Sequence, residues 1–137
     1  MINFYYEVSF TIQNTDEIQT WIKNVIVSEN FKSGDISYIF CDDAYLLKKN
    51  IKYLKHNILT DIISFDYTMG KLISGDIFIS VERVAENAKI FKTSITDELH
   101  RVMIHGVLHY CGYKDKTASE KATIRTKEDY YLSLRDF

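Results

Sequence analysis

The stretch HGVLHYCGYKD, residues 105–115, decides how the rest of the chain is interpreted. His105 and His109 are four positions apart, which on a helix is about 400° of rotation, so both imidazoles project from one face. Gly112 permits the left-handed turn that ends a helix, and the chain can then double back toward Asp115. Two histidines and one aspartate leave a fourth metal position for water, which is typical of catalytic zinc. The alternative is that Asp115 is a solvated loop residue.

The residue that follows the first histidine restricts the chemistry. A peptidase of the HExxH type carries its general base there, but this chain has Gly106, so that class is disfavoured. Glycine within a helix costs about 1 kcal/mol relative to alanine. Gly106 therefore indicates close approach of the backbone to a ligand or, equally, to a packed strand. His100 is about 140° away around the helix and is not expected to join the pair.

Outside this stretch, apolar periodicity predicts strands alternating with helices. The expected strands are 2–12, 35–41, 62–65 and 73–79, with a turn at Met69-Gly70, and the expected helices are 15–26, 42–53, 81–91, 96–111 and one opened by a capping box at Thr117–Glu120. The chain has no proline and no Gly/Ser-rich linker. We therefore expect an α/β or α+β fold with a mixed sheet of about four strands and about five helices in a single domain, 1–137.

Composition and charge further restrict the class of protein. The chain is 46% hydrophobic and 26% charged, which is ordinary for a globular domain, and its net charge of −2 argues against strong non-specific attraction to nucleic acid. A local basic patch or a metal ion can still supply a positive field for RNA.

Cys41 and Cys111 are expected to be free thiols in a reducing compartment. The first residues do not form a signal peptide, and no apolar run approaches the roughly 20 residues of a membrane span, so a soluble cytoplasmic protein is expected.

Three blocks of sequence together resemble a known family. Residues 105–115 resemble the signature H-G-x-L-H-x-x-G-Y-D-H, residues 59–65 (LTDIISF) resemble T-[DN]-V-L-S-F, and Ser74–Ile77 resembles a G-D-I strand. Their order and spacing match the bacterial YbeY family of endoribonucleases and rRNA maturation factors. The resemblance spans essentially the whole chain.

The resemblance implies a zincin-like fold with one Zn²⁺ ion held by His105, His109 and Asp115. It also implies cleavage of single-stranded RNA during maturation of the 3′ end of 16S rRNA and in ribosome quality control. The partners would be precursor rRNA and ribosome-associated proteins, and the location the cytoplasm. No membrane partner is implied.

The chain departs from the family pattern at two positions. The third ligand is usually His, but here it is Asp115, a harder ligand, so another divalent metal is possible. The family often has an arginine at the position of Leu54. Lys55 and His56 lie nearby and are candidates to contact phosphate in its place; the alternative is a solvated helix end.

The remaining candidate site residues are assigned roles from their positions within the blocks that resemble the family. Asp61 is the candidate base or the carboxylate that supports a metal-binding histidine, and Lys114 is a candidate to neutralise phosphate charge. Thr60 and Ser64 are expected to line the cleft, although turn and strand-start chemistry would explain both. Further basic residues either form a stripe that faces RNA or, interleaved with acids, a solvated helix face. These are Lys116, Lys121, Arg125 and Lys127, interleaved with Glu120, Glu128 and Asp129.

Three alternatives remain open from the residues themselves. The same ligands would serve a peptidase or amidase. They would also serve a ribosome- or RNA-associated module in which the metal is structural and no reaction takes place. In the third alternative no metal binds, and both histidines lie on a helix surface.

Overall fold

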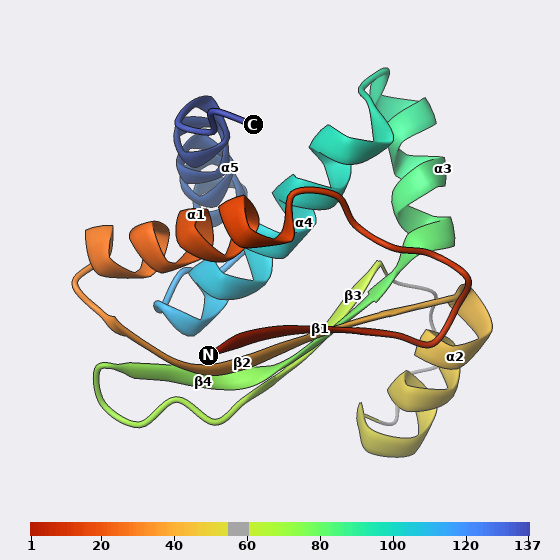
Figure 1. The fold of residues 1–137 in the computed structure, drawn as a ribbon, viewed down its shortest axis with the longest axis horizontal. Coiled ribbons are helices and arrows are strands. Elements are labelled where there is room, and N and C mark those ends of the chain that lie inside the picture. Colours follow the sequence, from red (N-terminus) through yellow and green to blue (C-terminus); the bar gives the residue numbers. More distant parts are fainter. Residues whose placement is uncertain (55–60) are drawn as a thin grey trace.

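The computed structural model describes residues 1–54 and 61–137, which form one mixed sheet and its covering helices (Figure 1). The strands are β1 Ile2–Tyr6, β2 Lys32–Cys41, β3 Ile62–Asp66 and β4 Leu72–Ser80, in the order β1-β2-β4-β3. The pairs β1·β2 and β2·β4 are parallel, and β3 runs antiparallel to β4. The helices are α1 Thr15–Ser28, α2 Asp43–Lys49, α3 Val81–Phe91, α4 Ile95–Tyr110 and α5 Ala118–Ser133, with a π-helical turn, η1, at Asn50–Leu54. This arrangement confirms the expected α+β fold.

The two faces of the sheet are covered unequally. Helices α1 and α4 lie over one face with α5 behind them, whereas α2 lies on the opposite side (Figure 1). The first face carries the main core, to which both helices contribute fully buried side chains, among them Ile22 and Met103. The second face carries a small cluster of Cys41, Leu46 and Ile63. The large core fixes α4, the helix that bears both histidines.

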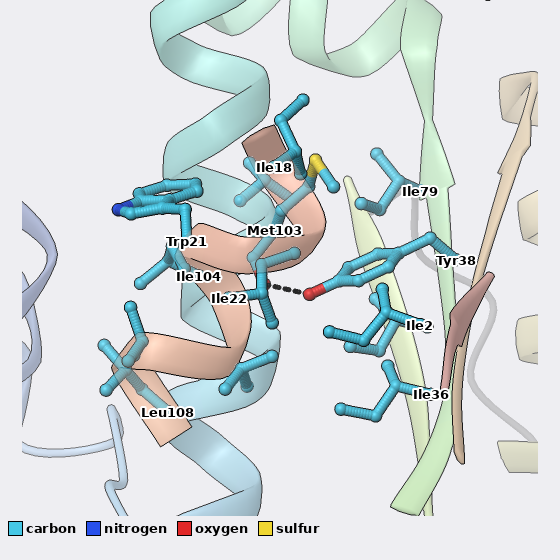
Figure 2. Close-up of a cluster of buried hydrophobic side chains, with 14 of the residues drawn as sticks. Ile2, Ile18, Trp21, Ile22, Ile36, Tyr38, Ile79, Met103, Ile104 and Leu108 are labelled. Atoms are coloured by element: carbon cyan, nitrogen blue, oxygen red, sulfur yellow. Dashed lines mark hydrogen bonds between the residues drawn. The ribbon is translucent and has the colours of Figure 1, made fainter. Parts of the chain in front are cut away.

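Helix α4 is held in place at its middle and at its start. The hydroxyl of Tyr38 on β2 donates to the carbonyl oxygen of Met103 at 2.9 Å, within the core (Figure 2). The hydroxyl of Ser94 caps the helix by accepting from the Asp97 amide at 3.0 Å. A Cβ atom at Gly106 would lie 3.0 Å from Ile77 Cδ1 of β4. The close approach predicted at Gly106 is therefore helix–strand packing.

The end of α4 is a glycine-dependent turn. Gly112 has φ of 101°, outside the range that residues with a side chain normally adopt. Its amide donates to the His109 carbonyl at 3.0 Å, and the Tyr113 amide donates to the Leu108 carbonyl at 3.1 Å. These two bonds form a Schellman motif, which directs residues 113–115 back toward the helix. The turn predicted from Gly112 is confirmed.

Several predicted boundaries were wrong by a few residues. The first strand was expected to reach residue 12 but ends at Tyr6, because its partner β2 ends at Cys41 and the last bond between them joins the Glu7 amide to the Phe40 carbonyl at 2.8 Å. The helix expected over 42–53 becomes π-helical at Asn50. The predicted caps are present: Asp42 accepts from the Tyr45 amide, and the capping box at residues 117–120 is complete. Among the described residues, no helix is both long and apolar enough to span a membrane.

Candidate metal centre

Three predicted ligands converge where α4 ends and its turn begins. The Nε2 atoms of His105 and His109 lie 2.9 Å apart, and Asp115 Oδ2 lies 3.1 Å from the first and 3.5 Å from the second. All three ligand atoms fall within 4.8 Å of one another. The two histidines are one helical turn apart, and the turn at Gly112 directs the chain so that Asp115 lies beside them. The three side chains are therefore brought together by residues that are close in sequence.

The other nitrogen of each imidazole is also engaged. His105 Nδ1 lies 2.6 Å from Glu128 Oε2, and His109 Nδ1 lies 2.9 Å from the carbonyl oxygen of Tyr113. Both partners are acceptors, so a neutral ring carries its proton on Nδ1, which leaves the lone pair of Nε2 available to a metal ion. Metal-binding histidines almost always have this kind of support.

Glu128 of α5 is the residue that sequence reasoning missed. It was interpreted as one of the acids on a solvated helix face, but its side chain is only 4% exposed. Its second oxygen accepts from Arg101 Nη1 at 2.9 Å, and Arg101 also pairs with Asp129. The spacing of Ile124, Glu128 and Tyr131, all buried, places Glu128 on the apolar face of α5, and that pattern is the signal that could have identified it.

The charge around His105 favours its protonated form when no metal competes. Burial by itself lowers the pKa of His105, but the carboxylates of Glu128, Asp115 and Asp61 outweigh burial, so the pKa lies above its usual value of 6.5. A site that attracts a proton in this way also attracts a metal cation.

The turn beside His109 is anchored by a second, partly buried carboxylate. Glu29, at the end of α1, accepts a hydrogen bond from the Tyr113 hydroxyl at 2.7 Å and another from the Tyr131 hydroxyl. Lys127 Nζ lies 3.5 Å from the same carboxylate. Through Tyr113, Glu29 fixes the carbonyl oxygen that orients His109.

A cavity of about 350 Å³ opens beside the ligands, between α3, α4 and α5. His105 and Asp115 line it, and so does Asp61, directly before β3. The Asn87 amide nitrogen lies 3.5 Å from Asp61 Oδ2. Burial is the main cause that raises the pKa of Asp61, which brings the carboxyl closer to the range of a general base.

The other predicted site residues lie in different places. Lys114 lines a separate hollow with His109 and Asp115. Ser64 contacts Tyr110 further along β3 and is not among the described residues that line the cavity beside His105. The predictions for Thr60, Lys55 and His56, and for the side chain at Leu54, fall outside the described residues.

Imidazole nitrogens and one carboxylate oxygen are donors suited to Zn²⁺ or a similar divalent ion, and three protein ligands leave a coordination position for water or substrate. The donor set therefore fits a catalytic metal. The fold and the site define a small α+β protein with a His-His-Asp group that could hold a metal ion, a donor set typical of metal-dependent hydrolases.

The comparisons with known proteins identify the family. The model of the Endoribonuclease YbeY family matches residues 4–135. Endoribonuclease YbeY of Flavobacterium johnsoniae is 56% identical over 134 residues, 98% of this chain and 96% of the relative. Its counterpart in Christiangramia forsetii is 52% identical over 133 residues, 97% of this chain and 93% of the relative. The chain belongs to the YbeY family of endoribonucleases, as its sequence predicted.

A solved structure agrees in fold. The solution structure of TM1509 from Thermotoga maritima aligns with a TM-score of 0.69 and 21% identity, covering 97% of this chain and 87% of that one. At this identity, the likeness supports the architecture alone.

Proposed function

We propose that this chain is a metal-dependent endoribonuclease that cuts single-stranded RNA and matures the 3′ end of 16S rRNA. Zn²⁺ is the metal we expect, and the cytoplasm, close to the ribosome and its associated proteins, is the expected place of action in maturation and quality control. Family membership supports the reaction, and the peptidase or amidase alternative has no comparable support.

The observation that carries this proposal is the paired support of the histidines. His105 and His109 both direct Nε2 toward Asp115, while Glu128 and the Tyr113 carbonyl engage both Nδ1 atoms. A pair of histidines on a helix surface needs neither support. We infer that these three side chains hold the ion, and that Asp115 replaces the usual histidine.

A metal ion in this position would polarise a phosphoryl oxygen and lower the pKa of a bound water molecule. Asp61, which lines the cavity beside His105, is placed to accept a proton from the attacking water. Lys114, on the other side of Asp115, is placed to offset phosphate charge. Roles for Thr60, Ser64, Lys55 and His56 in substrate binding remain predictions.

The first test is metal content by mass spectrometry, on protein purified without a histidine tag. We expect close to one Zn²⁺ per wild-type chain and little in Asp115→Ala. Asp35→Ala, at an exposed acid on β2 that is not part of the candidate site, is the matched control and should keep its metal. Wild-type protein that holds no metal, and retains none when Zn²⁺ is added, would remove the basis of the proposal.

The second test is cleavage of a labelled precursor fragment containing the 3′ end of 16S rRNA. Wild type should cut the single strand, and annealing a complementary strand should protect it. His109→Ala should lose activity, because one of three metal ligands is gone. Cleavage of the duplex at the same rate would contradict single-strand specificity, and full activity in His109→Ala would contradict the metal mechanism.

A further inference from the structure

The cavity beside the metal ligands has the properties of a binding site for one base of the RNA. Its volume of about 350 Å³ is within the range of about 300–1,000 Å³ of small-molecule pockets. His105 and Asp115 form one end of it, so a nucleotide held in the cavity would be adjacent to the phosphate at the metal. Figure 1 shows α3, α4 and α5, the helices that enclose it, around the same side of the sheet.

Apolar side chains supply much of the wall. Ile62, Val102 and Ile124 line the cavity together with Phe91, at the end of α3. The Phe91 side chain is 55% exposed, so its ring is accessible from solvent. Unpaired RNA bases commonly bind by stacking on aromatic rings and apolar surfaces of this kind.

Glu98, in the first turn of α4, supplies an acceptor with no partner. Its side chain is only 5% exposed and lines the cavity, yet its carboxylate makes no hydrogen bond or ion pair with any residue in 1–54 or 61–137. In the described part of the chain, Arg83 Nε is the fully buried side-chain polar atom without a hydrogen-bond partner, so the oxygens of Glu98 are open to the cavity. A ligand in the cavity can therefore reach them, and the metal ligands do not use them.

A carboxylate selects between bases by their hydrogen-bond donors. It accepts two parallel bonds, and guanine alone among the four RNA bases presents two adjacent donors, N1–H and the N2 amino group, on its Watson–Crick edge. Adenine, cytosine and uracil place an acceptor beside their donor, which would face the second carboxylate oxygen. The Asn87 amide, in the same cavity, offers a donor suited to O6 of guanine.

Two cations complete the site. Lys121 and Arg125 line the cavity from α5, and both are exposed. Within the described part of the chain neither forms an ion pair, whereas Arg101 in the same cavity is paired with Glu128 and Asp129. They are suited to the phosphates that flank a bound base.

We propose that this cavity is a guanine-binding subsite, in which Glu98 accepts hydrogen bonds from N1–H and N2–H and the enzyme cuts next to an unpaired guanosine. This inference rests on the proposed function and adds base preference to it. It also gives a physical reason for single-strand specificity, because the edge that Glu98 reads is hidden in a duplex.

The test is a binding series by isothermal titration calorimetry on Zn²⁺-loaded protein, with GMP, IMP and AMP. The phosphate and ribose are common to all three nucleotides, so a difference in affinity between them reports on contacts to the base. GMP should bind about tenfold more tightly than AMP, and IMP, which keeps N1–H but lacks the N2 amino group, should fall between them. Equal affinity for GMP and AMP in wild type would overturn the assignment without any variant.

The variant Glu98→Gln keeps the shape and exchanges one acceptor for a donor. The ratio of GMP to AMP affinity should fall to below about threefold, while AMP affinity is nearly unchanged. Glu17→Gln, at an exposed position on α1, is the matched control and should leave the ratio unaltered. A ratio in Glu98→Gln that equals wild type would also overturn the proposal.

Cleavage assays separate this inference from the proposed function. Oligonucleotides with a single guanosine, replaced in turn by inosine and adenosine, should be cut at that position with the same order of preference. Cleavage with no preference, together with a GMP-to-AMP ratio near one, would overturn the guanine subsite and leave the endoribonuclease proposal intact. If no RNA is cut at all, the proposed function fails, and the nucleotide series still decides whether guanine binds.

Discussion

The two histidines of the candidate metal centre are held by supports of different origin. His105 is held by the carboxylate of Glu128, which is 23 residues further along the chain on another helix. His109 is held by the carbonyl of Tyr113, only four residues away in the turn that ends its own helix. The first support exists only when α5 packs against α4, whereas the second is formed within the turn itself, and Glu29 only anchors that turn. The difference shows that the orientation of His105 depends more strongly on tertiary structure than that of His109.

The largest effect should follow loss of the long-range support. Glu128→Ala leaves Arg101 and His105 without their buried partner, and we expect unfolding free energy to fall by about 3–5 kcal/mol. Zinc affinity should fall by about 10- to 100-fold. Urea denaturation and competition with a chelator would measure the two effects.

The matched change Asp129→Ala removes the exposed partner of Arg101 and should cost under about 1 kcal/mol of unfolding free energy, with unchanged zinc affinity. Equal effects in both variants would contradict a special role for Glu128.

The next largest effect concerns Glu29, which anchors the His109 side. Burial raises the pKa of Glu29, but the hydroxyls of Tyr131 and Tyr113 and the charge of Lys127 outweigh burial, so its pKa lies below the usual 4.5. A depressed carboxyl pKa stabilises the fold above about pH 4.5, and that stability is lost as pH falls through the folded-state pKa.

Glu29→Gln should therefore cost about 2 kcal/mol at neutral pH and lose less further stability on acidification than wild type. Denaturation with a chelator present, at several values between about pH 7 and pH 3, isolates this group from metal release. Parallel acid curves for the two proteins would show that Glu29 does not carry the dependence.

A smaller effect is expected from Gly112→Ala. The φ of 101° at this position disfavours any side chain, so the fold should lose about 1–2 kcal/mol, and displacement of the turn should weaken zinc binding as well. Gly70→Ala is a matched control, because Gly70 also has a positive φ, 60°, with nothing within 4 Å of the added methyl group, and it lies in the β3–β4 connection. It should lose stability without losing zinc affinity. Loss of affinity in both variants would mean that stability alone governs the site.

The smallest effect should be that of Tyr113→Phe. The variant loses the hydroxyl that donates to Glu29 but keeps the carbonyl that orients His109, so we expect a loss of roughly 1 kcal/mol and nearly normal zinc affinity. Tyr131→Phe, which removes the other donor to Glu29, is the comparison. A large drop in zinc affinity in Tyr113→Phe alone would show that the hydroxyl matters more to His109 than the local turn does.

The same contrast explains what could be predicted from the sequence. His105, His109, Asp115 and the Gly112 turn follow from spacing within eleven residues, so helical geometry was sufficient to predict them. Glu128 and Glu29 were not predicted as parts of the site, because their partners are distant in sequence and a charged residue is usually solvated. The predicted end of the first strand was wrong for the same reason, because it too depends on a partner that is distant in sequence. Val8 and Phe10 continue the alternation of a strand, but β1 ends where its partner β2 ends.

The position of Glu128 also has a consequence for timing during synthesis. A ribosome makes α4 and its ligands first, and at about 5–20 residues per second the 23 residues between His105 and Glu128 take roughly 1–5 s. During that interval the nascent chain has its ligands but not the carboxylate that fixes His105. The support of His105 is therefore complete only after α5 has been made and has packed against α4, and we expect the full metal affinity of the proposed site to arise only then.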